Sequence, residues 1–222
     1  MSALVITGGG TGLGLELAKQ YEKNYDHVIL TGRTLKNLKK AKRSLEEIEI
    51  STSTYELDIR EENEINAFFH DIFNRYDVTA LINNAGVGHF SNLESISSAE
   101  VHEMIDTNVK GTIFMCKEVL PYYKKQNAGK ILNIVSTAGL RGKVNESVYV
   151  ASKFAVRGFT ESLVKELEDT KIVVTAAYMG GMDTPFWDDS DHIKDKSRLK
   201  SPQQIAKAIY QQDNGQPEIH ID

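Results

Sequence analysis

The chain has 222 residues, enough for one α/β domain with a sizeable buried core. Its 26 basic and 31 acidic residues give a net charge of −5 without a long basic block, so neither nucleic acid nor an anionic membrane is an expected partner. One cysteine, Cys116, excludes an internal disulfide, and the lack of a signal peptide or a run of about 18 apolar residues predicts a cytoplasmic protein.

The N-terminal segment predicts a strand, a glycine turn and a helix. Residues 3–6 form a short apolar run, and apolar residues recur at helical spacing from Leu13 to Tyr21. The turn between them lets a backbone approach a diphosphate closely, and the first N–H groups of the helix attract its charge. Because this context favours a nucleotide site over a purely structural turn, the expected cofactor contacts are Gly8, Gly10, Thr11, Gly12, Leu13 and Gly14.

The second expected strand, residues 27–31, ends beside an arginine. In many dinucleotide-binding folds this strand end carries an acid that binds the ribose hydroxyls of the adenosine. Arg33 stands there instead, and a guanidinium forms a bidentate, charge-assisted contact with the 2′-phosphate of NADP. The sequence therefore favours NADP(H) over NAD(H), unless Arg33 only solvates the end of the strand.

A charged helix is expected over residues 36–48 and a third strand over residues 50–57. The helix residues expected to face the core are Leu38, Leu45 and Ile48. Asp58 follows the third strand at the edge where parallel sheets bind ligands. It is expected either to contact the adenine or to cap the next helix, residues 61–73.

The fourth strand, residues 80–82, leads into Asn83-Asn84-Ala85-Gly86, where small residues leave room for a cofactor beside Asn84. A capping-box pattern at residues 97–100 then opens a long helix with Cys116 in its apolar stripe. Asn108 interrupts that stripe. An amide among apolar neighbours needs a specific partner.

The fifth strand, residues 130–135, ends at Ser136, and a helix carrying Tyr149 and Lys153 follows. A spacing of four places the phenol and the ammonium about one turn apart on one helix face. Lys153 is expected to lower the pKa of Tyr149 from about 10, because a nearby cation stabilises a phenolate. Taken alone the pair is weak, since such spacings arise by chance on many surface helices. Ser136 is expected to face the Tyr149 hydroxyl.

After a sixth strand over residues 171–177, a polar loop over residues 184–200 carries two large apolar side chains and is expected to form a substrate lid. A helix over residues 203–211 and a strand over residues 217–221 follow. Strands and helices alternate throughout. The sequence thus predicts one α/β domain over residues 1–222, a Rossmann-type doubly wound parallel sheet of about seven strands with helices on both faces.

Together and in this order, the motifs resemble the classical short-chain dehydrogenase/reductase family, in a short, bacterial-like form. The family's Thr-Gly-x3-Gly-x-Gly loop matches residues 7–14, and its Asn-Asn-Ala-Gly matches residues 83–86. The residues that this resemblance marks as catalytic are Asn108, Ser136, Tyr149 and Lys153. Tyr149, Lys153 and Thr184 are also expected to contact the cofactor. The usual Pro-Gly after the sixth strand is Met179-Gly180 here, a departure that removes no reactive group.

The resemblance implies an NADP(H)-dependent oxidoreductase that interconverts a carbonyl and an alcohol, as a ketone, aldehyde or 3-oxoacyl reductase does. Tyr149 would donate the proton while Ser136 binds the carbonyl oxygen. Lys153 would hold the nicotinamide ribose, and Asn108 would position a water that relays protons to it. The alternatives are an NADP-binding redox sensor and a scaffold without turnover, neither of which needs a proton donor.

The expected partners are a small carbonyl or alcohol substrate and a second copy of the chain. By resemblance, a homodimer forms through the helices of Asn108 and Tyr149, and a tetramer is the alternative. The residues expected to border the substrate are His89, Phe90, Leu140, Val144, Phe186 and Trp187. Surface lysines (Lys124, Lys125 and Lys171) leave an acyl carrier protein open as a partner. No metal is expected, because His89 and His192 lack partners at ligand spacing.

Overall fold

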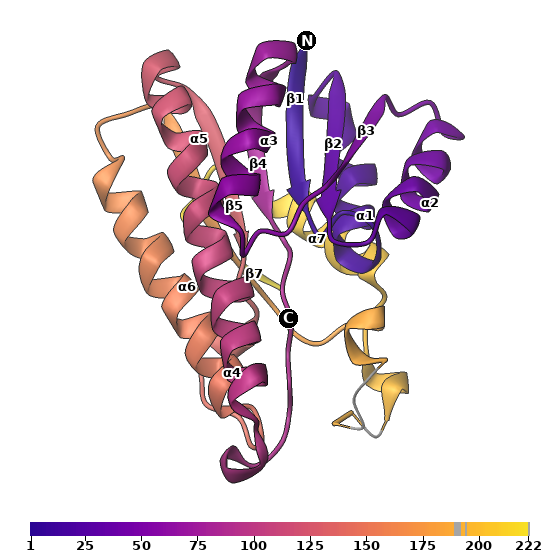
Figure 1. The fold of residues 1–222 in the computed structure, drawn as a ribbon, viewed down its shortest axis with the longest axis vertical. Coiled ribbons are helices and arrows are strands. Elements are labelled where there is room, and N and C mark those ends of the chain that lie inside the picture. Colours follow the sequence, from indigo (N-terminus) through magenta and orange to yellow (C-terminus); the bar gives the residue numbers. More distant parts are fainter. Residues whose placement is uncertain (189–191, 194, 222) are drawn as a thin grey trace.

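The computed structural model describes residues 1–188, 192–193 and 195–221. Within these residues, seven parallel strands form a sheet in the order β3-β2-β1-β4-β5-β6-β7, with helices on both faces (Figure 1). The predicted fold class is confirmed. The strands are β1 (Ser2–Thr7), β2 (His27–Gly32), β3 (Thr52–Glu56), β4 (Asp77–Asn83), β5 (Gly129–Ile134), β6 (Ile172–Met179) and β7 (Glu218–Ile221).

The helices cover the two faces of the sheet in two groups. The α-helices are α1 (Gly12–Tyr21), α2 (Leu35–Glu46), α3 (Glu62–Arg75), α4 (Ser98–Met104), α5 (Thr112–Gln126), α6 (Ser147–Glu166) and α7 (Pro202–Gln212). One apolar core joins α1, α2 and α7 to the sheet through residues such as Leu17 and Ile205. The other joins α3, α5 and α6 through residues such as Cys116 and Leu163. Among the described residues, no helix is long and apolar enough to cross a membrane.

Two helices have capped N-termini. Ser97 begins α4 and Ser201 begins α7, each in a capping box whose side chains bond reciprocally with the backbone. A π-helical segment, η3 (Ile105–Gly111), joins α4 to α5, so the long helix predicted there is continuous but locally widened. Short 3-10 turns complete the fold: η1 (Glu22–Asn24), η2 (Leu93–Ser95), η4 (Thr137–Gly139), η5 (Pro185–Trp187) and η6 (Lys196–Arg198).

One expected core residue lies outside. Ile48 is 56% exposed, because α2 ends at Glu46 and the chain turns away before β3. Glu49 has a φ of 64°, a left-handed conformation that ends the helical path. The helical period thus holds for Leu38 and Leu45, which are buried, but the helix ends two residues before Ile48.

The strand order places an opening at the carboxyl ends of the central strands. β1 pairs with β2 on one side and with β4 on the other, so the loops that leave β1 and β4 turn to opposite faces. A crevice forms at such a switch point, and open α/β sheets bind their ligands there. β5 pairs with β4 up to Asn133 and brings its own carboxyl end to the same edge.

A buried chain of polar side chains ties this edge to α6. Asn83 donates its amide to the Asn133 side chain at 2.9 Å, and Asn133 donates to the Thr160 hydroxyl, also at 2.9 Å. Thr160 in turn donates to the Val156 carbonyl at 2.7 Å. All three side chains are buried, so each bond replaces one that water would otherwise make.

Replacing Thr160 by Val keeps the shape of the side chain but removes the acceptor of a buried amide. We expect the free energy of unfolding to fall by about 1–3 kcal/mol, the cost of an unpaired buried donor. Urea unfolding measures this. Thr54→Val on the half-buried edge strand β3 is the matched control, and an equal loss in both variants would show that the buried chain contributes nothing special.

Candidate active site

The loop between β1 and α1 is built for close contact. Gly8 and Gly12 have φ angles of 63° and 53°, which favour glycine, and a Cβ on Gly14 would lie 2.4 Å from the Gly8 carbonyl oxygen. Thr11 is the N-cap of α1, and its side chain accepts none of the first N–H groups of that helix. Those donors are therefore available to an anion, with the helix dipole behind them.

The loop after β4 is fastened to the loop after β1. The Thr7 hydroxyl accepts the backbone N–H groups of Asn84 and Ala85, both at 3.0 Å. The Asn84 side chain donates to the carbonyl oxygens of Thr7 and Gly8 at 3.0 and 3.2 Å. Asn84 thus holds the glycine loop in place through its amide nitrogen.

Between these loops and α6 lies a cavity of about 350 Å³. Ser136 lines it, and so do eight of the residues predicted from the sequence to bind the cofactor: Gly8, Thr11, Gly12, Leu13, Asn84, Tyr149, Lys153 and Thr184. Gly14 packs beneath the loop instead. Gly10 faces α2, where a Cβ would meet Asn37 and Leu38 at 3.3 Å. Gly10 and Gly14 thus shape the loop but do not line the cavity.

Ser136 occupies a strained backbone position at the end of β5. Its φ of 94° lies in a region that non-glycine residues rarely adopt and that costs about 1–3 kcal/mol. The Ser136 hydroxyl accepts the Ala138 N–H at 3.2 Å, which fixes the start of η4. Strain of this kind persists where the surroundings hold it, and here it points a hydroxyl into the cavity.

Tyr149 and Lys153 lie on the cavity side of α6, and both are buried. The Lys153 ammonium donates to the Ile134 carbonyl oxygen at 3.0 Å and lies 5.8 Å from the centre of the Tyr149 ring. Burial lowers the pKa of Lys153 from its ordinary 10.5 to about 8, because the apolar surroundings disfavour the charged form.

Burial also governs the pKa of Tyr149, and raises it above the ordinary value of 10. A hydrogen bond with the Ser136 hydroxyl lowers this pKa, and the nearby carboxylate of Glu146 raises it further. Lys153 is not among the groups that shift the Tyr149 pKa, so the expected lowering by Lys153 is not seen, and burial raises this pKa instead.

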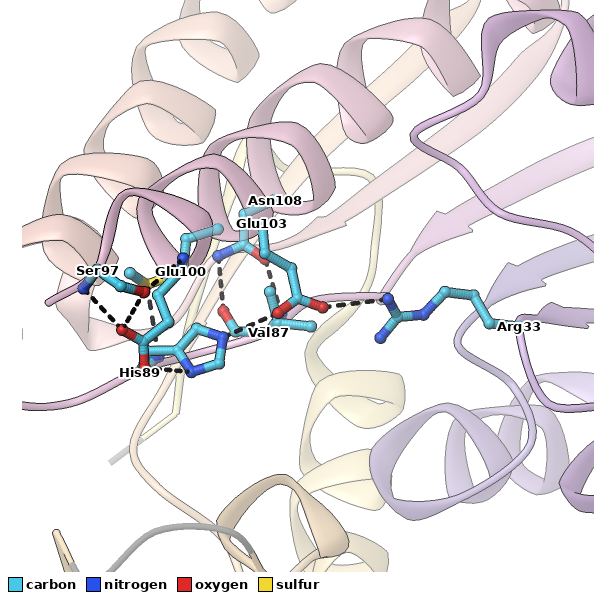
Figure 2. Close-up of polar contacts among 8 residues, drawn as sticks. Arg33, Val87, His89, Ser97, Glu100, Glu103 and Asn108 are labelled. Atoms are coloured by element: carbon cyan, nitrogen blue, oxygen red, sulfur yellow. Dashed lines mark hydrogen bonds and ion pairs between the residues drawn. The ribbon is translucent and has the colours of Figure 1, made fainter.

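Asn108 lies in the π-helical segment and is buried. Its amide donates to the Val87 carbonyl at 2.9 Å, and its oxygen accepts the Val87 N–H at 2.8 Å (Figure 2). The amide also donates to the Ser152 hydroxyl at 3.0 Å. The partner that the sequence demanded is thus the loop after β4. The side chain clamps that loop to α6. Its expected role in positioning a water stays a prediction.

Arg33 and Asp58 lie apart from the cavity. The Arg33 guanidinium meets the Glu103 carboxylate at 3.1 Å, reaching from the end of β2 towards α4 (Figure 2). Asp58 binds the Arg60 side chain and its backbone N–H, so it caps the turn before α3. Asp58 is not the cap of the next helix, because the N-cap of α3 is Glu61. An adenine contact stays a prediction.

The sequence reasoning missed Glu146. Its side chain is only 9% exposed, lines the cavity one turn before Tyr149, and binds His192 at 3.0 Å. The spacing of three from Tyr149 was the available signal, because residues three apart share a helix face. The ring of Phe90 contacts Tyr149 edge to face, and stacks on Trp187 and His192 at 4.9 Å from each. Phe90 and Phe186 thus pack on the Tyr149 ring.

The loop expected over residues 184–200 is described in part, since residues 189–191 and 194 lie outside the described residues. Its first part bends over the glycine loop: a Cβ on Gly12 would lie 3.2 Å from the Thr184 methyl group. In the described part of the chain, no three His, Cys, Asp or Glu side chains gather in a way that would hold a metal ion. The arrangement offers a nucleotide loop, a hydroxyl pair and a buried ammonium.

Replacing Lys153 by Met should stabilise the nucleotide-free protein by about 1–3 kcal/mol at pH 7, where burial of the charged ammonium is costly. The folded-state pKa is lower than the unfolded one, so the wild-type protein gains stability as the pH rises from about 8 to 10.5 and Lys153 loses its charge. The gap between variant and wild type should shrink over that window. Urea unfolding at pH 7 and pH 10 tests it, with Lys165→Met on the exposed face of α6 as control.

Comparison with known proteins agrees with this geometry. The family model for short chain dehydrogenases matches residues 2–194. An uncharacterized oxidoreductase of Staphylococcus saprophyticus is 32% identical over 92% of this chain and 82% of its own. The sepiapterin reductase of Chlorobaculum tepidum is 28% identical over 94% of this chain and 88% of its own.

Solved structures extend the likeness to three dimensions. A variant of actinorhodin polyketide ketoreductase with NADPH superposes with a TM-score of 0.90 at 26% identity, covering 99% of this chain and 95% of its own. ElxO with NADP bound superposes with a TM-score of 0.89 at 29% identity, covering 100% and 97%. With its sheet order, glycine loop and Tyr149–Lys153 pair, the chain belongs to the short-chain dehydrogenase/reductase family and is one of its oxidoreductases.

Proposed function

We propose that the protein uses NADP(H) to interconvert a small-molecule carbonyl and its alcohol. The observation that carries this proposal is the shared cavity: Ser136, Tyr149 and Lys153 line the same space as the glycine loop. A proton donor beside a nucleotide site is what carbonyl reduction needs, whereas a redox sensor or a scaffold needs only the nucleotide site or the fold. The enzyme is therefore favoured over both alternatives.

The residues fit a dinucleotide. A Cβ on Gly8 would lie 2.9 Å from Ala85, and one on Gly14 would strike the Gly8 carbonyl, so the cradle is one that only glycines leave open. The diphosphate would lie at the first N–H groups of α1, and the nicotinamide ribose beside Lys153. When bound, the cofactor supplies or accepts the hydride.

The protein handles the proton. Tyr149 stays protonated in its buried position and donates to the carbonyl oxygen, while the Ser136 hydroxyl hydrogen-bonds that oxygen as negative charge develops. Lys153 stabilises the resulting phenolate, because charge on Tyr149 gives the buried ammonium a partner. The rings of Phe90, Phe186 and Trp187 exclude water from this step and favour a substrate with apolar or aromatic surface.

Four further features belong to the proposal. Arg33 and the NADP(H) named in the titles of several solved neighbours favour NADP(H), although one neighbour of lower identity is described with NAD. Phe154 on α6 is 43% exposed, which suits a dimer formed through α5 and α6. The buried thiol of Cys116 suits a reducing, cytoplasmic compartment. The loop over residues 184–200 is proposed to close on the substrate.

Replacing Tyr149 by Phe removes the proton donor and leaves the ring packing in place. We expect turnover to fall by about 100- to 10,000-fold, the usual contribution of a general acid. NADPH should still bind. The rate of NADPH oxidation with a panel of ketones and aldehydes measures the loss, and Tyr210→Phe on α7 is the control. Full activity in the Tyr149 variant would exclude this mechanism.

Replacing Arg33 by Ala tests the cofactor preference. We expect the dissociation constant for NADPH to rise by about 10- to 100-fold, because a charge-assisted hydrogen bond to phosphate is lost, and that for NADH to stay the same. Lys39→Ala on α2 removes the same charge from a nearby exposed position and should affect both cofactors little. Equal effects on NADPH and NADH would contradict a 2′-phosphate contact.

A further inference from the structure

The guanidinium assigned to the 2′-phosphate is already occupied. Arg33 contacts Glu103 with one terminal nitrogen at 3.1 Å, although the two residues are 70 positions apart in the sequence. The two side chains are 46% and 29% exposed, so the pair lies at the protein surface, beside the loop after β4 (Figure 2). Gly86 and Val87 of that loop border the same surface hollow as Arg33 and Glu103.

Glu103 has a second partner that leaves it satisfied without Arg33. One carboxylate oxygen accepts from Arg33, and the other lies 2.9 Å from the His89 ring nitrogen Nε2. Hydrogen bonds from both His89 and Arg33 lower the pKa of Glu103, so its carboxylate is charged at neutral pH. If Arg33 swings to another anion, His89 still holds Glu103.

The neighbouring charges do not take over the role of either residue. Arg60 is bound to both oxygens of Asp58, so it is committed to its own turn. Glu100 accepts from the Ser97 hydroxyl and backbone and faces His89 at 3.5 Å. Among the contacts of the described residues, Arg33 and Glu103 are therefore the Arg–Glu ion pair that borders this surface hollow.

We propose that Glu103 sets the coenzyme selectivity by competing with the 2′-phosphate for Arg33. The 2′-phosphate of NADP(H) must either displace the Glu103 carboxylate from Arg33 or bind beside it against charge repulsion. Both lower the affinity for NADP(H). NAD(H) has a 2′-hydroxyl in place of the phosphate, so its affinity is unaffected. The inference rests on the proposed function, since it takes Arg33 as the phosphate contact.

The experiment is the isosteric change Glu103→Gln, read as equilibrium binding. Titrations with NADPH and with NADH, followed by the fluorescence of the reduced nicotinamide, give both dissociation constants without turnover. We expect the NADPH constant to fall by about two- to fivefold, as befits a partly exposed ion pair, and the NADH constant to stay the same. Glu103→Ala, a second variant, should shift in the same direction.

Glu100→Gln is the matched control. It removes a carboxylate from the same helix and the same histidine, keeps a residue that supports the capping box, and should leave both constants unchanged. In the Arg33→Ala background, Glu103→Gln should no longer change the NADPH dissociation constant, because the guanidinium for which the carboxylate and the phosphate compete is absent. A weaker or unchanged NADPH affinity in Glu103→Gln overturns the inference, since a weaker one would mean that Glu103 holds Arg33 in place for the phosphate.

These outcomes separate two failures. A wild-type protein that binds neither cofactor refutes the proposed function and the inference with it. If Arg33→Ala does not change NADPH binding, Arg33 does not contact the 2′-phosphate. The inference is then wrong, while the proposed hydride-transfer activity is unaffected. If Arg33→Ala weakens NADPH binding and Glu103→Gln does not strengthen it, the inference alone is wrong.

Discussion

The parallel pairing of β1, β4 and β5 is the constraint on which the site depends. Because the three strands run in one direction, their carboxyl ends meet at one edge, where the strand order also reverses. The glycine loop, the Asn84 loop and Ser136 each leave one of these ends. Thr7 bonds the first two loops together, and Asn133 ties β5 to α6 through Thr160. The position of Tyr149 over the crevice follows from those attachments.

The crevice concentrates groups that a stable core would avoid. Ser136 has a strained φ, Lys153 is a buried ammonium with a lowered pKa, and the Asn108 helix widens to a π-helical turn. Each costs folding free energy, and each is held by a specific contact: Ala138 for the serine, the Ile134 carbonyl for the lysine and Val87 for the asparagine. Departures from local rules that gather at one place mark a functional site rather than random defects.

Much of this could be predicted from the sequence, for reasons that differ by residue. The nucleotide loop, residues 7–14, is predicted from a local signal, since a strand, glycines and a helix follow one another within a few positions. The period of the apolar residues predicts the helices. Glu146 and Glu103 were missed because their significance comes from what faces them. The prediction that Ile48 faces the core is wrong for another reason. A regular apolar period does not indicate where a helix ends, and the left-handed conformation of Glu49 ends the helical path here. Asn108 was flagged correctly as unusual, yet its partner, Val87, was visible only in three dimensions.

Arg33 shows how far a residue type carries an argument about function. A guanidinium at the end of β2 points to phosphate by charge and position, both of which are readable along the chain. In the proposed exchange, the free energy of phosphate binding to Arg33 depends on Glu103, whose carboxylate contacts the guanidinium at 3.1 Å. His89 contacts the same carboxylate, so Glu103 would keep a partner if Arg33 turned to a phosphate. Under this proposal, coenzyme preference depends on the difference in free energy between Arg33 paired with Glu103 and Arg33 paired with the 2′-phosphate, and not on the presence of the arginine alone.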